Sequence, residues 1–274
     1  MIKNLAVCSW SLQPADPDDL AHKITQCGLA HTQLALDPIA AGEWDLDSVD
    51  HALSSAQIAI CSGMITTIGE DYSTLDSIKA TGGLRPDQHW EANQKRAQAA
   101  AIVANQLGLD LVTLHAGFIP DHGTAEYRTI TDRIKAIADI FGKHGINLAL
   151  ETGQERAESL LEMLNEPNLS TIGINFDPAN MILYAMGDPA KALELFQSRI
   201  VQAHMKNAIT TQSPGTWGTE VPAEQGEVDW NHFFSAIHAF PKSINVVIER
   251  EAGDNRISDI IEARKIASKF GCPR

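Results

Sequence analysis

Four short apolar runs decide the fold: LALE at 148–151, INFD at 174–177, VQAH at 201–204 and VVIE at 246–249. Each run resembles a buried strand, and each is followed by a segment with helical character. Each also ends in a side chain that can bind a metal ion, and these are Glu151, Asp177, His204 and Glu249. Three carboxylates and an imidazole suit a divalent ion such as Mn²⁺, Mg²⁺, Co²⁺ or Zn²⁺. We therefore predict that the four side chains converge on one metal ion.

Similar units fill the rest of the chain. Four earlier strands are expected, at Asn4–Trp10, His31–Leu36, Ile58–Ile65 and Leu111–His115. Helices are expected at about 18–26, 46–56, 90–107, 124–144, 156–164, 189–197, 229–239 and 256–269. Eight strand–helix units in 274 residues, without a change of composition that would mark a boundary, predict one domain over residues 1–274. Its fold class is α/β, a single (β/α)₈ TIM barrel.

The main alternative is an open, doubly wound sheet. That fold carries a glycine-rich turn after its first strand, whereas CSWSLQPAD at 8–16 contains no glycine. The barrel is therefore favoured. Two long segments, Thr66–His89 and Asn207–Glu227, are predicted to be loops. Loops of that length inside a compact domain are usually functional.

Composition narrows the class of partner. The formal net charge of -14 and the absence of a basic run argue against a nucleic-acid partner. No apolar stretch is long enough to cross a bilayer, and the first residues do not resemble a signal peptide. The four cysteines form no CxxC pair. We expect a cytoplasmic protein whose partner is a small molecule, and the sequence also allows a homo-oligomer.

The barrel gives the four strand ends a common location. Active sites of TIM barrels lie at the carboxyl ends of the strands, and strands five to eight are neighbours along one arc. A single acidic residue there is equally well explained as a cap of the following helix. Four in consecutive units favour a metal site, because charged groups at the ends of buried strands are costly unless paired or bound to metal.

Two further side chains are candidates for binding substrate near these strand ends. His115 ends the fourth predicted strand and could contact substrate, bind the metal or simply lie at the rim. Lys206 follows His204 by two positions, so it points to the same face of the strand. It could hold a substrate oxygen or form a salt bridge.

Other polar and aromatic residues complete the predicted site. Asn180 lies three residues after Asp177, in the expected loop, and is a partner for a sugar hydroxyl or a helix cap. Trp10 and Trp217 could form an apolar wall for a sugar ring or pack structurally. Arg250 directly follows Glu249 and should point away from it, because side chains alternate along a strand. We therefore interpret Arg250 as structural.

The ligand set suggests a class of chemistry. A divalent ion polarises a carbonyl group and the hydroxyl beside it, which makes the C–H bond between them more acidic. Glu151 and Glu249 would then act as the catalytic pair that removes and returns the proton. Return to the opposite face gives epimerisation, and return to the neighbouring carbon gives isomerisation. Loss of a β-hydroxyl would instead give dehydration.

Five stretches carry a resemblance to a known family: ALETGQE, GINFDPAN, QAHMKNA, EVPAEQGEVDW and VIEREAGD. The sequence resembles the xylose-isomerase-like TIM barrel superfamily, and within it the sugar phosphate isomerase/epimerase group. The resemblance implies a divalent metal, often Mn²⁺, held by Glu151, Asp177, His204 and Glu249. It also implies that Glu151 and Glu249 are the acid and base, and that the substrate is a sugar or keto-polyol.

The sequence departs from this family pattern at several positions. Many relatives have aspartate where this chain has Asn207, and Gly-x-Gly where it has Glu224-Gln225-Gly226. The ketose 3-epimerases carry histidine and arginine at the positions of Asn180 and Thr210. These differences leave the substrate class open.

Three alternatives to the isomerase or epimerase remain. One is a metal-dependent dehydratase or lyase of an inosose-type keto-polyol, which would use the same ligands. Another is an abasic-site endonuclease, against which the acidic net charge counts. The third is a barrel that binds a sugar without converting it.

Overall fold

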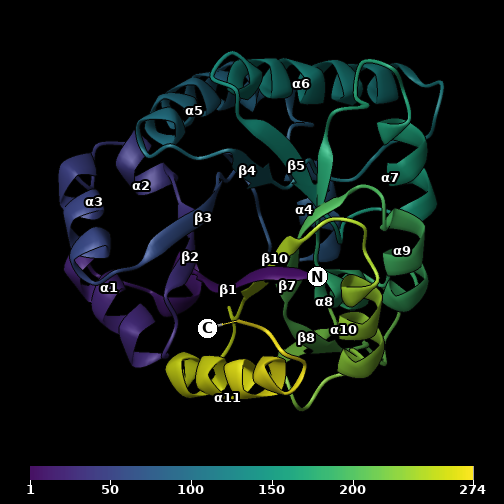
Figure 1. Ribbon diagram of the computed structural model, residues 1–274. Helices are drawn as coiled ribbons and strands as arrows, with labels where there is room; N and C mark the ends of the chain where they lie inside the picture. The colour runs from purple at the N-terminus through teal and green to yellow at the C-terminus, as the bar shows by residue number, and fades with distance from the viewer. Residues whose placement is uncertain (274) are drawn as a thin grey trace.

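The computed structural model describes residues 1–273, in which eight parallel strands close into a barrel (Figure 1). The barrel strands follow one another around the barrel in chain order. They are β1 (Ile2–Cys8), β2 (His31–Ala35), β3 (Ala59–Met64), β4 (Leu111–Leu114), β5 (Asn147–Glu151), β6 (Gly173–Phe176), β7 (Ile200–Met205) and β10 (Ile244–Ile248). β10 pairs with β1 and so closes the barrel. The predicted (β/α)₈ TIM barrel is confirmed.

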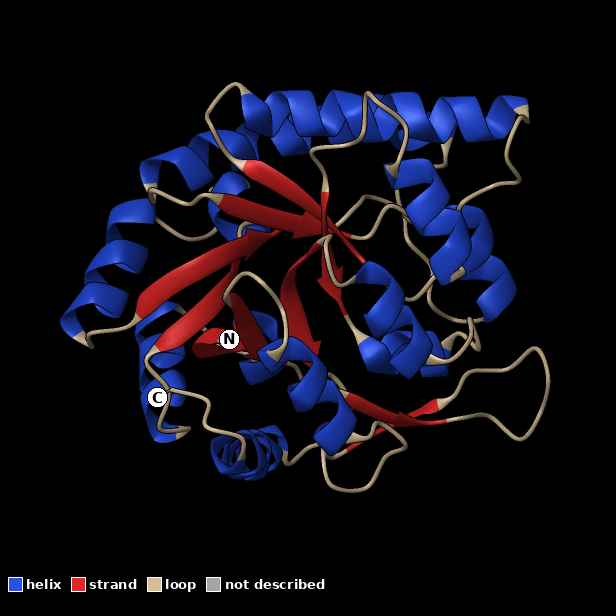
Figure 2. Cartoon of the chain, turned by 45° about the vertical axis from the view of Figure 1, so that its right-hand side comes forward, coloured by secondary structure: helices blue, strands red, loops and turns tan. Residues whose placement is uncertain are grey.

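A ring of helices surrounds the strands (Figure 2). Its members are α1 (Pro17–Gln26), α3 (Leu46–Ser55), α5 (Asp87–Gln106), α6 (Ala125–Gly142), α7 (Ala157–Leu164), α9 (Pro189–Phe196), α10 (Trp230–His238) and α11 (Arg256–Lys269). In α1, for example, the Asp16 carboxylate caps the helix by accepting a hydrogen bond from the Asp19 amide. Leu20 and Ile24 of the same helix are fully buried, and they form the apolar stripe expected of such a helix.

The interior of the barrel is polar as well as apolar. Gln33 on β2 donates a hydrogen bond from Nε2 to Thr113 Oγ1 on β4, at 2.8 Å. Ser62 Oγ on β3 donates to Gln202 Oε1 on β7, also at 2.8 Å. These strands are not neighbours, so both bonds cross the barrel interior. All four side chains are completely buried, and buried polar groups of this kind need such partners.

The segments after β1 and β3 correct two sequence-based predictions. β1 ends at Cys8, so Trp10 lies in a short 3₁₀ helix, η1 (Ser9–Leu12), and not in the strand. The segment predicted as a loop from Thr66 to His89 contains the helix α4 (Leu75–Thr81) and the first residues of α5. α4 begins with a capping box of Thr74 and Ser77, and it is too short to show a helical period in the sequence.

Four further short elements were not predicted. The segment Asn207–Glu227 contains β8 (Asn207–Ile209) and β9 (Thr219–Val221), which pair antiparallel outside the barrel. Figure 2 shows the loop between them projecting from the body of the molecule. The short helices α2 (Asp37–Ala40) and α8 (Pro178–Leu183) follow β2 and β6. Asn180 therefore lies in a helix and not in a loop. Within residues 1–273, no helix has the length and apolar character needed to span a membrane.

Candidate metal centre and substrate pocket

The four predicted ligands converge at the carboxyl ends of consecutive strands. Glu151 ends β5, Asp177 follows β6, His204 lies in β7 and Glu249 follows β10. Each side chain offers a ligand atom, and these atoms all lie within 4.8 Å of one another. All four residues are buried. The barrel thus brings together three carboxylates and one imidazole that are widely separated in sequence.

The Nδ1 atom of His204 is the centre of this cluster. It lies 3.1 Å from Glu249 Oε2, 3.4 Å from Glu151 Oε1 and 3.5 Å from Asp177 Oδ2. Burial by itself disfavours the imidazolium form, but the nearby carboxylates, Glu151 first, raise the pKa of His204 well above its ordinary value. The geometry therefore favours a positive charge at Nδ1, supplied either by a proton or by a metal ion.

The hydrogen bonds of Asp177 fit a metal ion. Its Oδ1 accepts a hydrogen bond from the Asn180 amide at 2.9 Å, which caps α8. Its Oδ2 is buried and has no hydrogen-bond partner among residues 1–273. An unpartnered, buried carboxylate oxygen is costly. A divalent cation bound between the carboxylates of the cluster and His204 Nδ1 would give Asp177 Oδ2 a partner. The hard oxygen donors suit Mn²⁺ or Mg²⁺.

The two glutamates are held in place by different neighbours. Glu151 accepts hydrogen bonds from Asn180 Nδ2 at 3.0 Å and from Asn175 Nδ2 at 3.1 Å. Burial alone would raise the pKa of Glu151, but the histidines beside it lower that pKa well below its ordinary value. Glu249 accepts a hydrogen bond from Trp10 Nε1 at 2.7 Å. Both carboxylates are therefore oriented by donors from other elements.

Gln33 also belongs to the centre, although it was not predicted from the sequence. Its Oε1 lies 2.8 Å from His204 Nε2, the ring nitrogen that faces away from the carboxylates. The Asn175 amide nitrogen is 3.0 Å from the same ring nitrogen, but it has Glu151 as an acceptor. The only signal in the sequence was a glutamine in the middle of the apolar run HTQLAL. Asn175 was missed as well, because it too is a single polar residue inside an apolar run, INFD.

A pocket of about 480 Å³ opens beside the metal cluster, a size that suits a small molecule. Glu249 lines it, and so do the five residues predicted to bind substrate: Trp10, His115, Asn180, Lys206 and Trp217. His115 Nε2 lies 3.3 Å from Glu151 Oε1, so it contacts a predicted ligand from the pocket side.

Lys206 is buried among oxygen atoms at the edge of the cluster. Its Nζ lies 2.6 Å from Glu251 Oε2 and 3.2 Å from Glu249 Oε2. It also donates a hydrogen bond to Asn180 Oδ1 at 3.2 Å. The salt bridge allowed by the sequence is therefore present, and the side chain faces the pocket as well.

Aromatic rings from three separate segments form one side of the pocket. Trp217 packs edge-on against Tyr184, with ring centroids 4.8 Å apart, and stacks on Tyr72 at 6.5 Å. Both tyrosines line the pocket, and neither was singled out from the sequence. Arg250, by contrast, points away from the cluster as expected, because it pairs with Glu220 at 2.6 Å and Asp259 at 2.9 Å.

The sequence and the fold both have known counterparts. The family model described as xylose isomerase-like TIM barrel matches residues 23–269. No curated protein matches the sequence. Among solved structures, the xylose isomerase domain protein from Planctomyces limnophilus is similar, with a TM-score of 0.85, 24% identity and coverage of 91% of both chains.

Two solved enzymes share the fold at lower identity. The D-allulose 3-epimerase from Methylomonas sp., in complex with D-allulose, gives a TM-score of 0.71 at 15% identity over 97% of this chain and 96% of that one. The probable 3-DHS dehydratase AsbF from Bacillus anthracis gives 0.72 at 18% identity over 97% and 98% of the two chains. At these identities, the likeness concerns the fold.

Proposed function

The chain belongs to the xylose isomerase-like TIM barrel family, and we propose that it is a divalent-metal-dependent isomerase or epimerase of a sugar or sugar-like keto compound. One observation carries this proposal. Glu151 and Glu249 belong to the same buried four-residue cluster, whose ligand atoms lie within 4.8 Å of one another, and the pocket opens beside it. The expected ion is Mn²⁺, with Mg²⁺, Co²⁺ and Zn²⁺ as alternatives.

In this proposal, the four residues of the cluster bind the ion, and two of them also transfer the proton. Asp177 and His204 hold the ion, together with the two glutamates. When bound, a divalent ion acts as a Lewis acid that makes the C–H bond beside a coordinated carbonyl more acidic. One glutamate removes that proton, and the other returns it. Trp10, which donates to Glu249 Oε1, keeps that carboxylate oriented toward the pocket.

A second candidate is supported by the position of Lys206. Its Nζ lies 3.2 Å from Glu249 Oε2 and faces the pocket. If a substrate carries a hydroxyl β to its carbonyl, a glutamate could remove the proton from the intervening carbon. The C–O bond to the β-hydroxyl would then break, and Lys206 would protonate the departing oxygen as water. The result is a dehydratase of a keto-polyol, whose product is lighter by one water.

Proton exchange tests the proposal directly. Metal-loaded protein should incorporate deuterium from D₂O at the carbon beside the carbonyl of at least one member of a panel of ketoses, aldoses and inososes. Glu151→Gln and Glu249→Gln should each reduce the exchange rate by about 10²-fold or more, as for loss of a general acid or base. Mass spectrometry of the same samples separates rearrangement from loss of water.

The control is Glu158→Gln, which removes one carboxylate from the exposed side of α7 and should leave exchange unchanged. If the loaded protein exchanges no carbon-bound proton of any panel member, the proposal is wrong. If the glutamine variants exchange as fast as the original protein, the roles assigned to the two glutamates are wrong.

A further inference from the structure

We propose that the substrate of this pocket is uncharged: a polyhydroxy carbonyl compound that carries neither a phosphate nor a carboxylate group. The inference rests on the proposed function and narrows its substrate class. Three independent features support it. The cationic side chains of the pocket are already paired, its acidic side chains outnumber them, and the backbone amides after β10 already donate to a carboxylate of this protein.

The cationic side chains at the pocket are already paired. Among the described residues that line it, only Lys206 and His115 can carry a positive charge. The Lys206 ammonium faces three oxygen acceptors, on Glu251, Glu249 and Asn180. An ammonium group has three N–H donors, so an anionic group of a substrate would have to displace one of these acceptors to reach it. The charge of His115 is offset by Glu151, because His115 Nε2 lies 3.3 Å from Glu151 Oε1, whereas its Nδ1 is buried and has no hydrogen-bond partner among residues 1–273.

A nearby arginine is engaged as well. Arg96 on α5 lies 3.5 Å from Asp37 Oδ1 and donates a hydrogen bond to Thr66 Oγ1 at 2.9 Å. It is absent from the pocket lining, whereas Asp37 and Thr66 belong to it. The acidic member of this pair thus faces the pocket, and the basic member lies behind it.

The pocket also carries acidic groups in excess of its cations. Asp37, Glu70, Glu249 and Glu251 all line it. The Glu70 carboxylate accepts hydrogen bonds from the Gly83 amide at 2.9 Å and from the Tyr72 hydroxyl at 3.3 Å. Within residues 1–273 it has no cationic partner at salt-bridge distance. A phosphate dianion would therefore be repelled on entry, even with a divalent ion bound at the cluster.

The backbone position that often binds phosphate in TIM barrels is occupied by a side chain of this protein. That position lies in the loops after the last two strands of the barrel. Here the amides of Glu251 and Ala252, directly after β10, donate to Glu220 Oε1 at 2.9 and 3.3 Å. Arg250 Nη1 donates to the same oxygen at 2.6 Å. The Glu220 carboxylate thus takes the donors that a substrate phosphate or carboxylate would need.

An uncharged polyol suits the same groups. The carboxylates of Glu70 and Glu251 can accept hydrogen bonds from hydroxyl groups without repelling them. The aromatic side chains of Trp10, Tyr72 and Trp217 line the pocket and offer apolar surface to the C–H groups of a sugar. The chemistry of the pocket therefore favours hydroxyl groups and disfavours anionic groups.

The test compares matched pairs of substrates. Neutral ketohexoses and their 6-phosphates, together with the corresponding keto acids, are offered to Mn²⁺-loaded full-length protein in the deuterium-exchange assay. We expect kcat/KM for the best neutral compound to exceed that of its phosphate ester and keto acid by about 100-fold or more. Equal or better processing of an anionic member would overturn this inference while leaving the proposed function intact. Failure of every compound would reject both.

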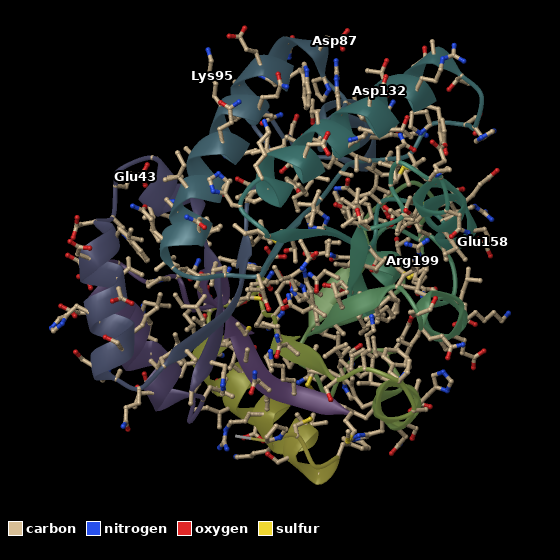
Figure 3. All side chains as sticks on the ribbon, turned by 45° about the horizontal axis from the view of Figure 1, so that its top comes forward. Glu43, Asp87, Lys95, Asp132, Glu158 and Arg199 are labelled. Carbon is tan, nitrogen blue, oxygen red and sulfur yellow. The ribbon has the colours of Figure 1, made fainter. Side chains whose placement is uncertain are left out.

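A charge variant provides an independent readout. Glu70→Gln removes one carboxylate from the pocket with little change of shape, and it should reduce the discrimination against the phosphate ester by about tenfold. Glu158→Gln is the matched control, because it causes the same change of net charge from the outer face of α7 (Figure 3). If both variants leave the discrimination unchanged, electrostatic exclusion is rejected.

Discussion

At the scale of single residues, a line of hydrogen bonds through the barrel interior sets the orientation of His204. Thr113 Oγ1 donates to Met64 Sδ and accepts from Gln33 Nε2. The carbonyl oxygen of Gln33 is thereby turned toward His204 Nε2, 2.8 Å away. A carbonyl oxygen can only accept, so this contact favours a hydrogen on Nε2, which leaves the lone pair of Nδ1 available to a metal ion. Such partners of metal-binding histidines fix the tautomer and the ring orientation.

Replacing Gln33 should therefore weaken metal binding. Gln33→Leu removes the acceptor, and we expect the Kd for Mn²⁺, measured by calorimetry on metal-free protein, to rise by about 10- to 100-fold. Gln33→Glu keeps an acceptor at this place and should retain most of the affinity. Gln202→Leu is the matched control, because Gln202 is equally buried but bonds to Ser62. Equal losses in Gln33→Leu and Gln202→Leu would contradict the positioning role.

At the scale of elements, the hairpin of β8 and β9 gives a structural role to Asn207, one of the departures from the family pattern. Asn207 Oδ1 accepts hydrogen bonds from the amides of Ala208 and Val228, both at 2.9 Å, while its Nδ2 donates to the Ala223 carbonyl at 2.7 Å. A Cβ atom added at Gly226 would lie 2.1 Å from Asn207 Oδ1. The asparagine and the glycine therefore form one packed unit that joins the hairpin to α10.

Asn207→Asp should loosen this unit, although it restores the residue that many relatives carry. The new carboxylate oxygen would face the Ala223 carbonyl where the amide now donates, and both groups are buried. We expect the free energy of unfolding to fall by about 2 kcal/mol, the cost of an unsatisfied buried group, as measured by urea denaturation. Asn147→Asp, at an exposed position, should cost much less. A variant as stable as the original protein would contradict this account.

At the scale of the whole molecule, the metal cluster joins four adjacent strands of the barrel. Its ligands come from β5, β6, β7 and β10. In the metal-free protein, three buried carboxylates would lie close together, and the neighbouring groups that offset their charge are His115, His204 and Lys206. Any ion that binds only the folded state stabilises that state by mass action. Metal binding and the stability of the barrel should therefore be coupled.

Chelation should accordingly lower the melting temperature. With Mn²⁺ at about 100 times its Kd, the ion contributes about 2.7 kcal/mol, which corresponds to a shift of about 5–10 °C for a domain of this size. Asp177→Asn removes a ligand while keeping the oxygen that caps α8, so its melting temperature should hardly respond to Mn²⁺. Scanning calorimetry with and without chelator measures the shift in melting temperature for the original protein and for the variant. Equal shifts in the two proteins would place the stabilising ion elsewhere.

The fold was predictable because its signals are local. An apolar run with a polar end, followed by a capped helix, can be recognised within about 30 residues, and eight such units fit a closed barrel. The four strand-end residues could be named for the same reason, and the structure places them together. The short elements α4, α8 and the β8–β9 hairpin were missed, because they are too short to produce a periodic pattern.

By itself the sequence determined the order of strands and helices, the barrel, and the residue types at the strand ends. Only the tertiary structure decided which distant side chains meet. Gln33 and His204 are 171 positions apart, and Glu220 reaches amides more than 30 positions further along the chain. Contacts of this kind depend on how the strands close into a barrel and how the loops fold over it. No periodic pattern along the chain records that closure, so the charge of the substrate had to be inferred from the assembled pocket.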